Sequence, residues 1–271
     1  MIKAIKESLS QIYSLTETSV KLNLRYKLRF AMYMISPIFT LIVPIIILGK
    51  FYEYNAQFGP WTKANYFVFI MMSYNILLLR GTMGYIPRRF LTDKYWKTIA
   101  LYLLAPFKTY CILLGLVFSR LIIISIPFML FFLFCYIYHP ISFYTILFVF
   151  LLYFLLLLLF SGMGIVLGVF AISNENIWGV LNFFLHFFFW FSCLTFPYQI
   201  FPPIFQIIIN LNPFYHIFNI LRVAWIVNNP LYVIKLYFIE FLILLFPSII
   251  FPIVGVFIFN RIYYKYGIRG Y

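Results

Sequence analysis

The chain has 271 residues, of which 65% are hydrophobic and only 10% are charged, yet its formal net charge is +14. A soluble domain carries about a quarter charged residues, so this chain has too few to cover a water-facing surface. Its Lys and Arg lie in short clusters between apolar runs, which argues against nucleic acid as a partner. The sequence therefore predicts an all-α, multi-pass membrane protein with several helices of ~20 apolar residues.

The first 29 residues are too polar to cross a membrane. Between residues 2 and 28, apolar side chains recur at spacings of three and four, which is the period of an amphipathic helix. We expect this segment to lie along the membrane surface. A helix packed on a partner protein is the alternative.

Six apolar stretches follow, and each is long enough to cross a bilayer. They cover about residues 30–50, 64–86, 108–136, 143–171, 177–196 and 232–259. With a cytoplasmic N-terminus, fifteen Lys and Arg fall on the inner side and four on the outer side. This bias predicts that both termini are cytoplasmic. The whole chain, 1–271, is expected to form one membrane domain, with spans one and two in 30–86, spans three to five in 108–196, and span six and a basic tail in 232–271.

Two connections have features of their own. Residues 87–107 read as a cytoplasmic segment with a short helix at 93–105, capped at Thr92 or Asp93 and ended by Pro106. Residues 197–231 are too apolar for an open loop, and their prolines cut them into pieces too short to cross. We expect two short re-entrant helices in the outer leaflet there.

The sequence contains no recognisable catalytic or metal-binding pattern. Cys111, Cys135 and Cys193 lie far apart in apolar runs, and the three histidines have no neighbouring carboxylate pair. A phosphate-binding G-x-x-x-x-G-K-[ST] loop is absent from the sequence. We therefore expect no catalytic residue, no metal and no cofactor in this chain.

The segment KTIALYLLAP, residues 97–106, resembles the G-T-L-E-x-L-L-x-[ST]-P motif of type-2 ATP-binding-cassette exporter permeases. Thr98 and Pro106 match, whereas Lys97 and Ala100 replace the glycine and the glutamate. The resemblance implies a non-enzymatic permease subunit that couples through this helix to a separate ATPase, which holds ATP and Mg. The residues expected to contact that ATPase are Tyr95, Trp96, Thr98, Ile99 and Pro106.

A second resemblance to the same family lies between residues 192 and 222. SCLTFP at 192–197, then Pro202, then NPFYH at 212–216 and Leu221-Arg222 resemble the family's S-G-x-x-[FY]-P-x-x-x-x-P, x-P-[LF]-[TY]-[YH] and L-R. Cys193 stands where the family usually has glycine. The resemblance implies export and an outer gate formed by Pro197, Pro202, Asn212, Pro213, Tyr215 and Arg222. For Arg222 the alternatives are anchoring to lipid headgroups and contact with substrate.

Within this family, LRYKLR at 24–29 followed by Ser36-Pro37 resembles the polysaccharide-exporting branch. That resemblance implies a complex of two copies and two ATPase subunits in the cell membrane, moving a lipid-linked glycan. Aromatic residues make up 24% of the chain, and sugar rings stack on aromatic rings. Candidate pathway aromatics are Phe184, Phe187, Phe188 and Phe191. An exporter of hydrophobic drugs or lipids and a non-transporting scaffold are the alternatives, and A/T-rich codons would also explain the aromatic content.

Two charges lie well inside the predicted spans. Arg120 is ~18 Å from the inner end of span three, and Glu240 is ~12 Å from the outer end of span six. A lone charge in mid-bilayer costs about 2.5–3.5 kcal/mol on insertion scales, so each needs a partner or water. Because the two depths coincide, we expect Arg120 and Glu240 to pair or to line one wet cavity.

Overall fold

The computed structural model describes residues 2–53, 58–96, 98, 108–173 and 175–267. Within these ranges the chain is helical, apart from short connections and an isolated bridge between Phe58 and Trp61. The helices are α1 Ile2–Arg25, α2 Lys27–Glu53, α3 Tyr66–Tyr95, α5 Thr109–Tyr138, α6 Phe143–Ser173, α7 Glu175–Trp190, the 3₁₀ helix η1 Tyr198–Ile200, α8 Pro203–Leu211, α9 Pro213–Val227, α10 Pro230–Leu236 and α11 Phe238–Gly267.

Five of the described helices are long and apolar enough to cross a membrane. They supply the stretches Phe30–Tyr52, Tyr66–Tyr95, Tyr110–Tyr138, Phe143–Ser173 and Phe238–Arg261. A sixth crossing is counted if α8 and α9, which meet at a 90° bend, act as one broken span. The helical, multi-pass architecture predicted from composition is therefore confirmed.

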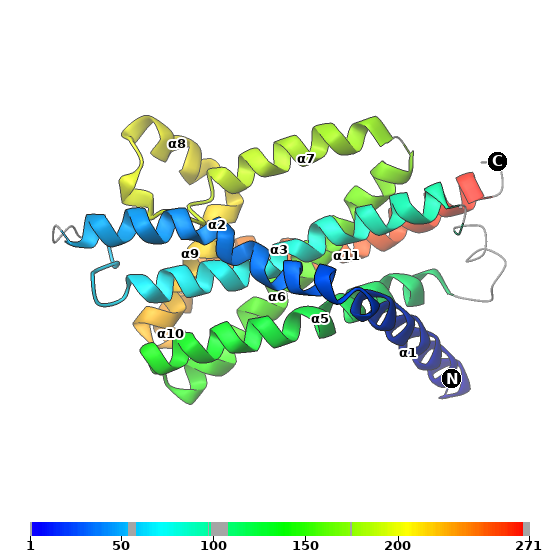
Figure 1. Ribbon diagram of the computed structural model, residues 1–271, viewed down its shortest axis with the longest axis horizontal. Helices are drawn as coiled ribbons and strands as arrows, with labels where there is room; N and C mark the ends of the chain where they lie inside the picture. The colour runs from blue at the N-terminus through cyan, green and yellow to red at the C-terminus, as the bar shows by residue number, and fades with distance from the viewer. Residues whose placement is uncertain (1, 54–57, 97, 99–107, 174, 268–271) are drawn as a thin grey trace.

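Helix α6 lies in the centre of the bundle, between α3 and α11 (Figure 1). Two of its glycines let the neighbouring backbones approach closely. A Cβ on Gly164 would lie 3.1 Å from Met83 Cα of α3, and one on Gly162 would overlap the backbone nitrogen of Pro252 in α11. Lipid tails are as apolar as the side chains, so close packing at small residues holds such helices together.

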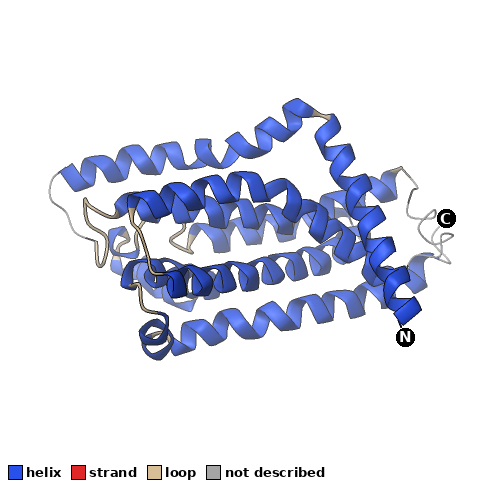
Figure 2. Ribbon diagram, turned by 90° about the horizontal axis from the view of Figure 1, so that it is seen from below, coloured by secondary structure: helices blue, strands red, loops and turns tan. Residues whose placement is uncertain are grey.

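Helix α1 crosses one end of the bundle steeply, while the long helices run roughly parallel to one another (Figure 2). It packs on the first half of α5: Ser8 Oγ lies 2.8 Å from Tyr110 Oη, and a Cβ on Gly115 would lie 2.7 Å from Leu15 Cβ. A helix that lies on the membrane surface beside crossing helices has this orientation.

The predicted start of the cytoplasmic helix was wrong. The chain does not leave span two at residue 86, because α3 continues to Tyr95. Thr92 Oγ1 donates to the Arg88 carbonyl, and Arg89 Nε lies 3.1 Å from Asp93 Oδ2, both within the last turns of α3. Thr92 and Asp93 therefore end a long helix instead of capping a new one. Most of 93–105, including Ile99, and also Pro106 lie outside the described residues.

Two predicted spans also have different bounds. The helix in the stretch 177–196 is shorter than predicted, because α7 ends at Trp190 and has 16 residues, which gives about 24 Å of helix. The stretch 232–259 is broken at Tyr237, which separates α10 from α11. Between them the two predicted short helices are present as α8 and α9, and α10 adds a third.

Candidate functional site

Arg222 of α9 is buried at the junction of three segments and is only 3% exposed. Its Nη1 donates to the Cys193 carbonyl at 2.8 Å, and its Nη2 donates to the Leu194 carbonyl and to Ser73 Oγ, each at 2.8 Å. The guanidinium also lies 4.0 Å from the ring centroid of Phe69. Arg222 thus ties α9 to the 191–196 turn and to α3. Of the two alternatives for Arg222, anchoring to lipid headgroups does not fit, because the side chain does not reach the surface of the chain.

The turn that Arg222 holds has an unusual backbone conformation at Cys193, whose φ is +53°. This left-handed conformation costs a residue with a Cβ roughly 1–2 kcal/mol and favours glycine. The position is the one where the exporter motif usually has glycine. Cys193 therefore adopts a conformation that favours glycine, while its own side chain is buried.

The predicted gate residues lie at the helix ends of this region. Asn212 is buried, caps α9 by accepting from Phe214 N at 3.0 Å, and donates to the Phe188 carbonyl of α7 at 2.6 Å. Pro213 is the first residue of α9, and Pro197 and Pro202 precede η1 and α8. Missing N–H groups are tolerated at such positions. The structure brings these residues into one region, and their role as a gate stays a prediction.

Tyr215 joins the same region through an aromatic contact. Its ring stacks on that of Tyr198, with 5.3 Å between the centroids. Tyr198 Oη accepts a hydrogen bond from Asn210 Nδ2 at 3.0 Å. These contacts link η1, α8 and α9 at one end of the bundle.

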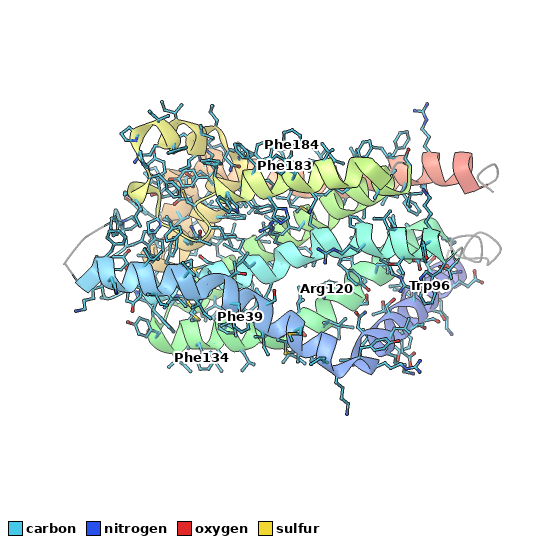
Figure 3. All side chains as sticks on the ribbon, turned by 45° about the horizontal axis from the view of Figure 1, so that its top comes forward. Phe39, Trp96, Arg120, Phe134, Phe183 and Phe184 are labelled. Carbon is cyan, nitrogen blue, oxygen red and sulfur yellow. The ribbon has the colours of Figure 1, made fainter. Side chains whose placement is uncertain are left out.

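Helix α7 has two different faces. Phe183, Phe184, Phe187 and Phe188 are each between 44% and 69% exposed, and Figure 3 shows Phe183 and Phe184 on the outside of the helix. Phe191, which follows the helix, is half-buried and stacks against Phe205 of α8 at 5.8 Å. Three of the candidate pathway aromatics, Phe184, Phe187 and Phe188, therefore belong to an outward-facing apolar surface in the single chain, whereas Phe191 does not.

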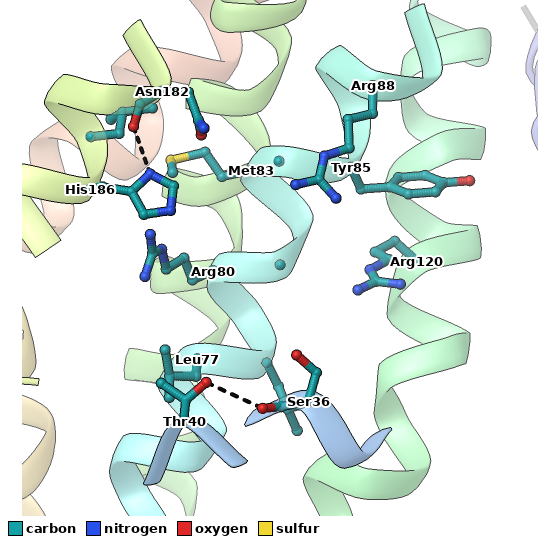
Figure 4. A pocket seen from close by; sticks show the side chains of 14 residues that line it. Ser36, Thr40, Leu77, Arg80, Met83, Tyr85, Arg88, Arg120, Asn182 and His186 are labelled. Atoms are coloured by element: carbon teal, nitrogen blue, oxygen red, sulfur yellow. Dashed lines mark hydrogen bonds between the residues drawn. The ribbon is translucent and has the colours of Figure 1, made fainter. Parts of the chain in front are cut away.

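The opposite face of α7 borders a cavity of about 290 Å³ that also touches α2, α3 and α5 (Figure 4). Charged and polar side chains are concentrated in its lining. The lining residues are Ser36, Thr40, Leu77, Leu78, Arg80, Gly81, Met83, Gly84, Tyr85, Arg88, Arg120, Asn182, Leu185 and His186.

The sequence analysis missed this cavity because it counted Arg80 and Arg88 among the fifteen Lys and Arg on the cytoplasmic side of the membrane. A signal was present: Arg80, Gly84 and Arg88 recur every four residues and so share one face of α3. Gly84 has no Cβ, and a Cβ built there would meet no atom within 4 Å, so that face has open space.

Arg120 and Glu240 do not pair. Arg120 lies on the cavity, 5.4 Å from the ring centroid of Tyr85. Glu240 is in the first turn of α11, where both its carboxylate oxygens accept from Asn219 Nδ2 at 3.1 Å and Oε1 lies 3.5 Å from His216 Nδ1. The two residues neither pair nor share the cavity, because the break at Tyr237 places Glu240 at a helix end beside α9.

Tyr95 and Trp96 lie at the end of α3 and are 85% and 71% exposed. Figure 3 shows Trp96 at the end of the bundle that α1 crosses. Thr98 Oγ1 donates to Asp93 Oδ1 at 3.1 Å, which fixes the chain just beyond the helix. The exposed pair is available to another protein. Their assignment to an ATPase contact remains a prediction.

The described residues contain no group of three His, Cys, Asp or Glu that could hold a metal ion. A comparison with curated proteins gave no match. The sequence model of the family described as ABC-2 type transporter matches residues 10–226, which include α2 to α7 and the Arg222 region. With this match over most of the chain, and with helices suited to crossing a membrane, the protein belongs to the ABC-2 type transporter membrane family.

Proposed function

We propose that this chain is the permease subunit of an ATP-driven exporter in the cell membrane, and that two copies form the path of a lipid-linked glycan. Membership of the family makes the chain the membrane subunit of an ABC transporter and implies association with ATPase subunits. ATP and Mg are bound by that separate ATPase. Two ATPase subunits complete the complex.

The observation that carries the proposal is the two-faced character of α7. Its outward face carries exposed aromatic side chains, while Asn182 and His186 face a polar cavity. A substrate with an apolar tail and a polar head matches both faces of such a helix. A purely hydrophobic drug would gain nothing from the polar lining, because it would desolvate those groups without bonding to them.

The exposed aromatic surface also supports a dimer. In a single copy, the aromatic face of α7 would be exposed to lipid tails. A sugar moving along it would have no protected route across the bilayer core. A second copy facing α7 would enclose the aromatic side chains, whose rings present apolar faces on which sugars stack. The gate region around Arg222 and α8 would then lie at the exit.

The test is transport in vesicles that contain this chain and its ATPase. We expect ATP turnover and substrate movement to respond to a lipid-linked glycan and not to hydrophobic drugs. The variants F184A and F187A should slow transport, whereas F134A, which removes an equally exposed phenylalanine on α5, should not.

Stimulation by drugs alone would identify a drug exporter and contradict the glycan proposal. Purification without any ATPase would instead favour a scaffold. Mass measurement of the solubilised complex should give two copies of this chain and two ATPase subunits, and an active monomer would contradict the dimer.

A further inference from the structure

The cavity beside α7 concentrates positive charge. Arg80, Arg88 and Arg120 all line it, together with His186 (Figure 4). Arginine keeps its charge at any physiological pH. The lining contains no Asp or Glu among the residues that the structure describes. The cavity therefore carries at least three positive charges and no negative side chain on its described walls.

Aromatic rings pack against Arg80 and Arg120, and a glycine leaves space for Arg120. The Arg80 guanidinium lies 4.0 Å from the ring centroid of Phe189, and Arg120 lies over Tyr85. Gly81 makes room for Arg120, since a Cβ there would lie 3.0 Å from Arg120 Nη2. A ring covers the face of a guanidinium, and the N–H donors point outward in the guanidinium plane. This geometry leaves the plane of Arg80 suited to an acceptor group in the cavity.

The depth of Arg80 favours water or a counter-charge beside it. Arg80 is about 21 Å along α3 from Tyr66, so it lies well within a helix that is long and apolar enough to cross the membrane. Charged groups at such depth line water-filled cavities or ion pathways, and they pair with charges of opposite sign. An anion entering the cavity would supply that charge.

We propose that this cavity binds the phosphate or pyrophosphate group of a lipid-linked substrate. The planar guanidinium pairs with phosphate oxygens through two parallel hydrogen bonds, and several arginines suit a group with more than one negative charge. At about 290 Å³ the cavity is at the small end of ligand pockets, so it fits a headgroup and not a whole glycolipid. The aromatic face of α7 lies next to it for the apolar chain. This inference rests on the proposed function, since it names the charged part of the same substrate.

Binding can be measured on the intact complex with its ATPase in phosphatidylcholine nanodiscs. The probe is radiolabelled farnesyl diphosphate, with unlabelled farnesyl diphosphate, farnesol, inorganic pyrophosphate and phosphatidylglycerol as competitors. We expect unlabelled farnesyl diphosphate to compete at least about tenfold better than each of the other three, because charged hydrogen bonds and the lipid chain both contribute. Added salt should weaken binding.

Equal competition by farnesol would overturn the proposal, since the charge would then contribute nothing. Equal competition by inorganic pyrophosphate would assign the site to a soluble anion, and equal competition by phosphatidylglycerol would assign it to an ordinary headgroup. Either result would overturn the assignment to a substrate.

Variants then locate the site. Arg88 is exposed at the cavity mouth, so Arg88→Gln should leave folding intact and weaken farnesyl diphosphate binding about tenfold. Gly84→Leu should weaken it similarly by filling the cavity, because no atom lies within 4 Å of a Cβ at that position. Arg261→Gln removes another exposed arginine, on α11 and outside the cavity lining, and should bind like the parent protein. Parent-like binding by both Arg88→Gln and Gly84→Leu would overturn the site.

The two proposals can fail separately. If Arg88→Gln and Gly84→Leu transport the glycan normally and bind the probe normally, the cavity proposal fails and the exporter proposal stands. If the probe binds with the predicted variant pattern while no glycan moves, the anion site stands and the proposed substrate fails.

Discussion

Arg222 Nη1 donates a hydrogen bond to the carbonyl oxygen of Cys193, 29 residues earlier in the chain, at 2.8 Å. Cys193 is in the left-handed conformation, which turns the chain sharply after α7. The neighbouring Leu194 carbonyl points to the same guanidinium. One buried cation therefore satisfies two carbonyls of a strained turn that no helix could satisfy, which explains why a charge is kept in an apolar region.

We predict that Arg222→Met severely destabilises the protein, because two buried carbonyls lose their donor. Each unsatisfied group costs about 1–3 kcal/mol. Arg222→Lys should recover only part of the lost stability, since an ammonium group cannot reproduce the planar set of N–H donors of the guanidinium. The measurement is the unfolding temperature of the purified protein. Lys235→Met, at an exposed position of α10, is the control and should unfold like the parent protein.

Cys193→Gly should change the free energy of unfolding by less than about 1 kcal/mol, because relief of the left-handed conformation offsets the lost side chain. The same change at Cys111, which is buried in the first turn of α5, should cost about 1 kcal/mol or more, because no backbone relief offsets the lost side chain there. Denaturant titration of both variants compares them directly. A larger loss of unfolding free energy at position 193 than at position 111 would show that the thiol, and not the backbone conformation, determines the stability of the turn.

Gly162→Ala is expected to destabilise the bundle by about 1–3 kcal/mol, since the new methyl group would overlap the backbone of α11 at Pro252. Gly49→Ala in α2 is the matched control, because a Cβ there meets no atom within 4 Å. Thermal unfolding in detergent measures both. Equal unfolding temperatures of Gly162→Ala and Gly49→Ala would mean that α6 and α11 can move apart without loss of stability.

Trp96→Ala should weaken the association with the ATPase about tenfold or more, as expected for an exposed tryptophan at an interface. ATP hydrolysis should then continue without transport, while the chain still inserts into the membrane. Trp190→Ala is the control, because Trp190 is 79% exposed at the far end of α7. Normal coupling in Trp96→Ala would remove Trp96 from the ATPase contact.

A double-mutant cycle should separate the partners of Glu240. Glu240→Ala and Asn219→Ala should be coupled by about 0.5–3 kcal/mol, since the two side chains share hydrogen bonds. Glu240→Ala and Arg120→Ala should be additive within about 0.5 kcal/mol. Coupling between Arg120 and Glu240 would contradict the structure described for this region.

Much of the fold was predictable because its cause is local. Apolar stretches longer than ~20 residues must form helices in a bilayer, where every backbone group needs an internal partner. The breaks at Pro203, Pro213 and Pro230 were also predictable, because proline cannot donate a helical hydrogen bond. Family-like spacing from residue 192 to Arg222 marked a region that the structure does bring together.

Contacts between distant helices were decided only by the tertiary structure. The sequence placed Arg120 and Glu240 at matching depths, but helix rotation and the break at Tyr237 set their actual partners. Likewise, Arg80 and Arg88 became part of a cavity only because α3, α5 and α7 bring their polar faces together. Depth along a helix follows from counting residues, whereas the direction in which a side chain points depends on how neighbouring helices pack.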